Sequence, residues 1–131
     1  MNYYFSTTLK NSSFEDVKEK VTAALKEEGF GVLTHIDVKA TLKKKIDVDF
    51  RPYEILGACN PHFAHKALLA EDKIGIMLPC NVIIEETNNG DIIVSAVDPI
   101  ASMGAVENNN LEEIANEVQQ KLKRVIDSLK K

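Results

Sequence analysis

The sequence predicts an α+β domain in which helices pack on a mostly antiparallel sheet. Short segments alternate with period two, segments with helical-period apolar stripes lie between them, and an Asn-Gly turn joins two β-rich runs. The expected order is β-α-β-(short α)-β-α-β-β-α. A chain of 131 residues that is 44% hydrophobic fits one domain, residues 1–131, with a single core.

The first expected strand and helix lie before residue 30. Residues 3–9 alternate between two faces, which is the pattern of a strand. Ser12 is expected to open the next helix, with Glu15 as its capping-box partner. Gly29 can end that helix in a left-handed conformation. The buried stripe of this helix is expected to be Phe14, Val17, Val21 and Leu25.

A second strand and a short helix are expected to follow. Residues 30–37 form the strand, with Leu33 and His35 on one face. Its other face is expected to hold Phe30, Val32, Thr34 and Ile36. Asp37 can cap the short helix. The apolar residues of that helix, which we expect to dock on the sheet, are Val38, Leu42 and Ile46.

Residues 53–59 read as a third strand that leads directly into a helix. Asn60 followed by Pro61 is a strong helix start, because asparagine is a good N-cap and proline suits the first helical position. The helix is expected to end near Asp72.

A hairpin and a long helix complete the predicted fold. Residues 82–86 and 92–97 flank an Asn89-Gly90 turn, and Asp98-Pro99 ends the second strand. A polar, flexible segment is expected up to residue 109, after which Asn110 caps the last helix. The buried stripe of that helix is predicted to be Leu111, Ile114, Val118, Leu122, Val125 and Leu129.

Charge and hydropathy exclude several classes of protein. The net charge of −4 argues against a nucleic-acid-binding module, which normally has a basic face. No window approaches the ~18 consecutive apolar residues of a membrane span. The N-terminus lacks the basic start and apolar segment of a signal peptide. We therefore expect a soluble cytoplasmic protein, with cysteines that are reduced thiols or ligands.

The residues that can carry chemistry are concentrated between positions 51 and 81. Both cysteines lie there, each followed by asparagine and each beside a proline: Cys59-Asn60-Pro61 and Pro79-Cys80-Asn81. A helix from Pro61 carries the chain about 18 Å away from Cys59, and an extended segment over 74–79 carries it about 20 Å back. Our hypothesis is that both Cys-Asn pairs meet at one end of the sheet. A parallel crossover would instead place the cysteines at opposite ends.

Several short motifs occur in a fixed order through the middle three-quarters of the chain. They are Gly29-Phe30-Gly31, Ile36-Asp37-Val38, Asp49-Phe50-Arg51-Pro52-Tyr53, Ile55-Leu56-Gly57-Ala58-Cys59-Asn60-Pro61, Ala64-His65, Leu78-Pro79-Cys80-Asn81-Val82 and Asp98-Pro99. In these motifs the chain resembles the domain of unknown function 302 family. The resemblance implies a compact α+β domain that forms a homodimer, and it implies no particular activity.

One interpretation of these residues is a metal or redox site. Cys59, Cys80 and His65 offer two soft sulfur ligands and an imidazole, a set that suits zinc or copper(I). A helix N-terminus next to Cys59 would favour its thiolate. The spacing matches no recognised zinc-finger or redox signature, and free cysteines are most often small buried hydrophobes.

A second interpretation is a ligand-binding domain. Polar groups at the helix start could hold a polar or anionic ligand. Each of them also has a structural interpretation: Asn60 as a helix cap, Arg51 in a local ion pair, Asp98 as the turn that ends a strand. The residues of this candidate site are Arg51, Cys59, Asn60, His65, Cys80, Asn81 and Asp98.

A third interpretation is a structural or interaction module that dimerises through a sheet edge or the last helix. His35 fits a surface or interface position there. The sequence contains no nucleophile–base motif, no glycine-rich phosphate loop and no paired carboxylates on one helix face, so we do not predict an enzyme.

Overall fold

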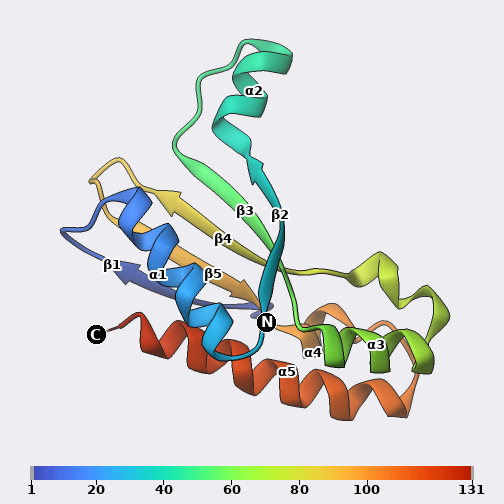
Figure 1. Ribbon diagram of the computed structural model, residues 1–131. Coiled ribbons are helices and arrows are strands. Elements are labelled where there is room, and N and C mark those ends of the chain that lie inside the picture. Colours follow the sequence, from blue (N-terminus) through green and yellow to red (C-terminus); the bar gives the residue numbers. More distant parts are fainter. Residues whose placement is uncertain (1, 131) are drawn as a thin grey trace.

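A computed structural model describes residues 2–130 and contains one five-stranded sheet (Figure 1). The strands lie in the order β1-β5-β4-β3-β2, and every neighbouring pair is antiparallel. This architecture confirms the predicted α+β class. The strands are β1 (Tyr4–Leu9), β2 (Gly31–Asp37), β3 (Tyr53–Cys59), β4 (Cys80–Glu86) and β5 (Ile92–Val97).

Helices account for most of the remaining chain. They are α1 (Phe14–Glu27), α2 (Val38–Ile46), α3 (Pro61–Ala70), α4 (Pro99–Ser102) and α5 (Asn109–Ser128), and a 3-10 helix, η1, spans Asp72–Met77. None of the helices within residues 2–130 combines the length and the apolar character needed to cross a lipid bilayer.

Helices α1 and α5 cover one face of the sheet and form the core with it (Figure 1). The predicted stripe of α1 is confirmed at Val17, Val21 and Leu25, whose side chains are fully buried. The predicted stripe of α5 is also buried, except that Ile114 is only partly so. Apolar side chains at helical spacing therefore meet the inward-facing residues of the strands, as the periodicity predicted.

Two helix starts differ from the prediction by one or two residues. The N-cap of α1 is Ser13, not Ser12, and its side chain accepts a hydrogen bond from the backbone N–H of Asp16. The N-cap of α5 is Asn108, not Asn110. Its carboxamide oxygen accepts from the Asn110 N–H, while its amide donates to the carbonyl of Ala70 at 2.8 Å. This long-range bond selects Asn108 from three consecutive asparagines.

A β-bulge corrects the predicted faces of β2. The register with β3 shifts between Val32 and Thr34. Because one extra residue reverses the alternation that follows it, His35 pairs with Leu56 and lies on the helix side of the sheet. Thr34 and Ile36 therefore lie on the opposite face from Val32, whereas the unbroken period-two pattern had placed all three together.

The prediction that α2 docks on the sheet is wrong. Helix α2 has no buried residue, and Ile46 is 62% exposed. Figure 1 shows α2 at the far end of the β2–β3 pair, projecting beyond the body of the molecule. The other helices do not extend to this end of the sheet, so the apolar residues of α2 have nothing to pack on except the adjoining strands.

The return from α3 to β4 differs from the expected extended segment. Helix α3 ends at Ala70, two residues earlier than predicted, and η1 then occupies most of the connection. Ile74 anchors this connection, being 1% exposed in a small cluster with Ala67, Met103 and Leu111. The predicted hairpin is confirmed: β4 and β5 pair across a turn in which Gly90 has a φ of 84°.

Candidate functional site

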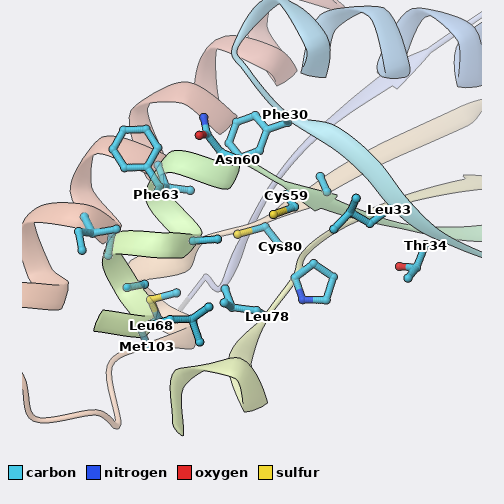
Figure 2. A pocket seen from close by; sticks show the side chains of 17 residues that line it. Phe30, Leu33, Thr34, Cys59, Asn60, Phe63, Leu68, Leu78, Cys80 and Met103 are labelled. Atoms are coloured by element: carbon cyan, nitrogen blue, oxygen red, sulfur yellow. The ribbon is translucent and has the colours of Figure 1, made fainter. Parts of the chain in front are cut away.

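A cavity of about 300 Å³ lies where the ends of β3 and β4 meet α3 and α5 (Figure 2). Its wall is almost entirely apolar and includes four alanines, and no charged side chain among residues 2–130 lines it. Asn60, Thr34 and the two cysteines are the polar residues of the wall. The lining residues are Phe30, Leu33, Thr34, Ala58, Cys59, Asn60, Phe63, Ala64, Ala67, Leu68, Leu78, Pro79, Cys80, Met103, Ile114, Ala115 and Val118.

Cys59 and Cys80 meet at this cavity. Cys59 is the last residue of β3, and Cys80, the first residue of β4, pairs with Ala58. Both cysteines line the cavity and are labelled in Figure 2, although the register directs the side chains of Cys80 and Cys59 to opposite faces at this end of the sheet. The antiparallel connection therefore returns Cys80 beside Cys59, as the chain-length argument predicted, although the return runs through η1 and not through an extended segment.

The environment of Cys80 favours the neutral thiol. Its side chain is buried, and both burial and the nearby Cys59 raise the pKa of the Cys80 thiol from 9.0 to about 11. Burial is the larger cause, because an apolar wall solvates a thiolate poorly. Cys59 is only partly buried and is therefore the more accessible of the two thiols.

Asn60 links α3 to the end of α1. It occupies the N-cap position of α3 but makes no side-chain capping bond. Its amide instead donates to the carbonyl of Glu28 at 3.3 Å. The chain at Gly29 runs close by, with a φ of 86°, and a Cβ there would lie 3.0 Å from the Asn60 amide nitrogen. Asn60 is therefore the N-cap residue of α3, as predicted, but its side chain connects α3 to the end of α1 and does not form a capping hydrogen bond.

Arg51 and Asn81 lie at a different hollow, on the sheet face opposite α1 and α5. They help to line a space of about 590 Å³. The guanidinium of Arg51 is 2.9 Å from the Glu85 carboxylate and lies over the rings of Phe50 and Tyr53. The expected local ion pair of Arg51 is present, with Glu85 as its partner. The alternation of β4 explains the separation, since Cys80 and Asn81 are consecutive and face opposite sides.

The structure does not bring His65 and Asp98 into the cavity. His65 is exposed on α3, and it is absent from the cavity lining. Asp98 caps α4 by accepting from the Ile100 N–H, and it also accepts from the Gln119 side chain at 3.1 Å. Within residues 2–130, no three His, Cys, Asp or Glu side chains gather in a way that could hold a metal ion.

A polar cluster that was not predicted from the sequence lies under α1. The buried carboxylate of Glu54 accepts from Lys18 Nζ at 3.1 Å and also pairs with His35 Nε2. Burial lowers the pKa of Lys18, but the carboxylates of Glu54 and Glu15 outweigh it and raise that pKa overall. The only sequence signal for this cluster was a glutamate at an inward position of β3. The bulge that turns His35 toward it left no recognisable pattern.

The comparisons with known proteins agree with this architecture. The family model for the domain of unknown function DUF302 matches residues 5–129. The chain belongs to the DUF302 family. The crystal structure of an uncharacterized conserved DUF302 protein from Bacillus stearothermophilus superposes with a TM-score of 0.88 at 28% identity, covering 97% of this chain and 98% of that one. No curated protein matches the chain.

Proposed function

We propose that this DUF302 domain is a homodimeric ligand-binding protein whose ligand is a small, uncharged and mostly apolar molecule. The observation that carries the proposal is the cavity of about 300 Å³, whose wall contains no charged side chain from the described part of the chain. This volume lies at the lower end of the ~300–1,000 Å³ range of small-molecule sites. An ionic ligand would lose its hydration there without gaining a charged partner, so the chemistry of the wall favours a neutral one.

Small side chains keep the cavity open. Ala58, Ala64, Ala67 and Ala115 all line it, and larger apolar residues at these positions would fill the space. Of the seven residues that the sequence singled out, only Cys59, Asn60 and Cys80 lie in the wall. The ligand site therefore consists of these three residues and the apolar side chains around them.

Binding can be measured with a matched pair of small molecules. Isothermal titration calorimetry should detect binding of indole, which is neutral, and little binding of indole-2-carboxylate. Ala115→Leu, which fills the wall, should abolish indole binding, whereas Ala23→Leu at an exposed position of α1 should leave it unchanged. Failure of indole to bind, or equal binding by the Ala115→Leu variant, would favour a structural module without a ligand.

The uncovered face of the sheet supports the homodimer. Helices α1 and α5 pack on the other side, and Tyr3 and Tyr4, which are 66% and 42% exposed, line a hollow on this face together with Arg51, Asn81 and Glu85. Interfaces between protein subunits are commonly enriched in aromatic residues and arginine and have a polar rim. Sedimentation velocity should show a dimer that Tyr4→Lys dissociates and that Gln120→Lys, at an exposed site on α5, leaves intact. A monomeric wild-type protein would refute this part of the proposal.

A further inference from the structure

The side chain of Asn60 is held in one orientation at the edge of the cavity. Asn60 is 8% exposed, and its amide nitrogen donates to the Glu28 carbonyl at 3.3 Å. A Cβ at Gly29 would lie 3.0 Å from this nitrogen, so the glycine leaves room for the amide on that side. The nitrogen and the oxygen are the two branches of one planar group. The bond to Glu28 therefore turns the amide oxygen away from the end of α1.

The amide oxygen of Asn60 has no hydrogen-bond donor among residues 2–130. An N-cap side chain usually accepts from the first turn of its helix, and this one does not. Within the described part of the chain, every side-chain nitrogen or oxygen that is fully buried has a hydrogen-bond partner, so this oxygen is not sealed in the core. It faces open space, and the open space that Asn60 lines is the cavity.

Two aromatic rings flank the Asn60 amide. Phe30 and Phe63 line the cavity on either side of it (Figure 2). Aromatic side chains pack well against another flat ring, either offset-stacked or edge to face. A ligand between them would cover the amide oxygen. A ligand without a donor would leave that oxygen unpaired and dry, which is unfavourable, whereas a ligand with an N–H or O–H group would satisfy it.

We propose that Asn60 selects the ligand by accepting a hydrogen bond from it, so that the cavity binds neutral aromatic molecules with an N–H or O–H donor. This inference rests on the proposed function and narrows its ligand to one chemical class. Heteroaromatic rings with an N–H group and phenols belong to the class. Aromatic hydrocarbons and sulfur heterocycles of the same shape do not.

The test compares indole with benzothiophene, a ring of nearly the same shape in which sulfur replaces the N–H group. Isothermal titration calorimetry gives the ratio of the two dissociation constants, and comparing this ratio between variants removes the difference in hydrophobicity between the ligands. Asn60→Leu has a similar shape but no acceptor, and it should shift the ratio against indole roughly five- to tenfold. Thr34→Val is the matched control. It removes a hydroxyl of the wall that lies apart from Asn60 in Figure 2, and it should leave the ratio unchanged.

A measurement on the wild-type protein decides the question if Asn60→Leu does not fold. The NMR resonance of the side-chain carbonyl carbon of Asn60 should move downfield when indole binds, because an accepted hydrogen bond withdraws electron density from that carbon. Benzothiophene should move it much less. Both ligands place an aromatic ring in the cavity, so the difference between the two shifts reports the hydrogen bond.

The outcomes separate this inference from the proposed function. If indole binds but the ratio is the same in the wild-type protein and Asn60→Leu, or the two ligands shift the Asn60 resonance equally, the inference is wrong and the proposed function stands. A ratio that changes only in Thr34→Val would also overturn the inference and would assign the hydrogen bond to Thr34. If neither ligand binds, the proposed function fails and this inference fails with it.

Discussion

Replacing Gly57 by alanine tests the packing at the edge of the cavity. A Cβ at this position would overlap Oγ1 of Thr34 and would lie 2.7 Å from Cγ of Pro79. The Thr34 hydroxyl can rotate away, but the Pro79 ring cannot move without its backbone, so β4 must shift at its start. Forcing an extra methyl group into a packed site costs about 1–3 kcal/mol. Because one of the two neighbours is rigid, we expect the free energy of unfolding to fall by about 2 kcal/mol.

Urea denaturation of Gly57→Ala, compared with Gly31→Ala, measures this cost. Gly31 lies on the neighbouring strand, and nothing is within 4 Å of a Cβ built there, so its substitution should be neutral or slightly stabilising. Adding Thr34→Ala to Gly57→Ala removes one of the two overlaps and should recover at least about 0.5 kcal/mol as a coupling energy. The reasoning would be refuted if Gly57→Ala and Gly31→Ala unfolded at the same urea concentration.

Three further predictions concern the core, the helix junction and pH. Val118→Asp should cost about 3 kcal/mol or more in thermal or urea unfolding, because Val118 is 6% exposed, and Gln120→Asp on the exposed side of α5 should cost far less. Asn60→Ala should lower the free energy of unfolding by about 1–2 kcal/mol, because it leaves the Glu28 carbonyl unpaired. Asn60→Asp should lower it further, because a carboxylate cannot donate a hydrogen bond to that carbonyl. Equal stability of both variants and the wild-type protein would contradict this prediction. Burial raises the pKa of Cys80 from 9.0 to about 11, so its contribution to stability is complete below pH 9 and is lost as the pH rises, because the unfolded chain releases the proton first. By pH 10 the wild-type protein should have lost about 1.4 kcal/mol of stability relative to Cys80→Ala. Urea denaturation of both proteins at pH 8 and pH 10 measures this loss. The same pH dependence in the two proteins would contradict the prediction.

The periodicity of the sequence predicted the elements of the core but not the irregularities between them. Val17, Val21 and Leu25 are buried because three- and four-residue spacing places them on one side of a helix. The bulge between Val32 and Thr34 has no glycine or proline to mark it. It reverses the faces of the rest of β2, and only pairing with β3, a long-range contact, defines it.

Helix boundaries depended on individual hydrogen bonds, one local and one long-range, that residue type alone does not determine. Ser12 and Ser13 are both good N-cap residues, and the bond that distinguishes them is the one from the Asp16 N–H. Asn108 is selected by its bond to Ala70, a residue 38 positions away. The short amphipathic pattern of α2 predicts a helix with an apolar side, but it does not predict whether another part of the protein is near enough to cover that side. Ile46 of α2 is exposed.

The sequence predicted that the two cysteines lie close together in the fold, but it did not predict which other residues line the site. Antiparallel strands joined by a helix and a return segment had to bring Cys59 and Cys80 together, whatever the form of the return. Residue type alone grouped Arg51 and Asn81 with them, although strand alternation places these two on the other face. The apolar wall went unnoticed because an alanine that lines a cavity and an alanine that fills a core look the same in a sequence.

The alternation along β4 also makes the two proposed surfaces separable. Cys80 lies in the cavity wall and Asn81 lines the hollow on the uncovered face, so substitutions such as Ala115→Leu and Tyr4→Lys act on opposite sides of the sheet. Gly57 is the exception, because it pairs with Asn81 and with Thr34, while the Pro79 ring beside it forms part of the cavity wall. A methyl group at Gly57 presses on both surfaces at once. The Gly57→Ala variant should lose both indole binding and the dimer, whereas Ala115→Leu should lose only indole binding and Tyr4→Lys only the dimer. This result would locate the junction between the two surfaces at the start of β4.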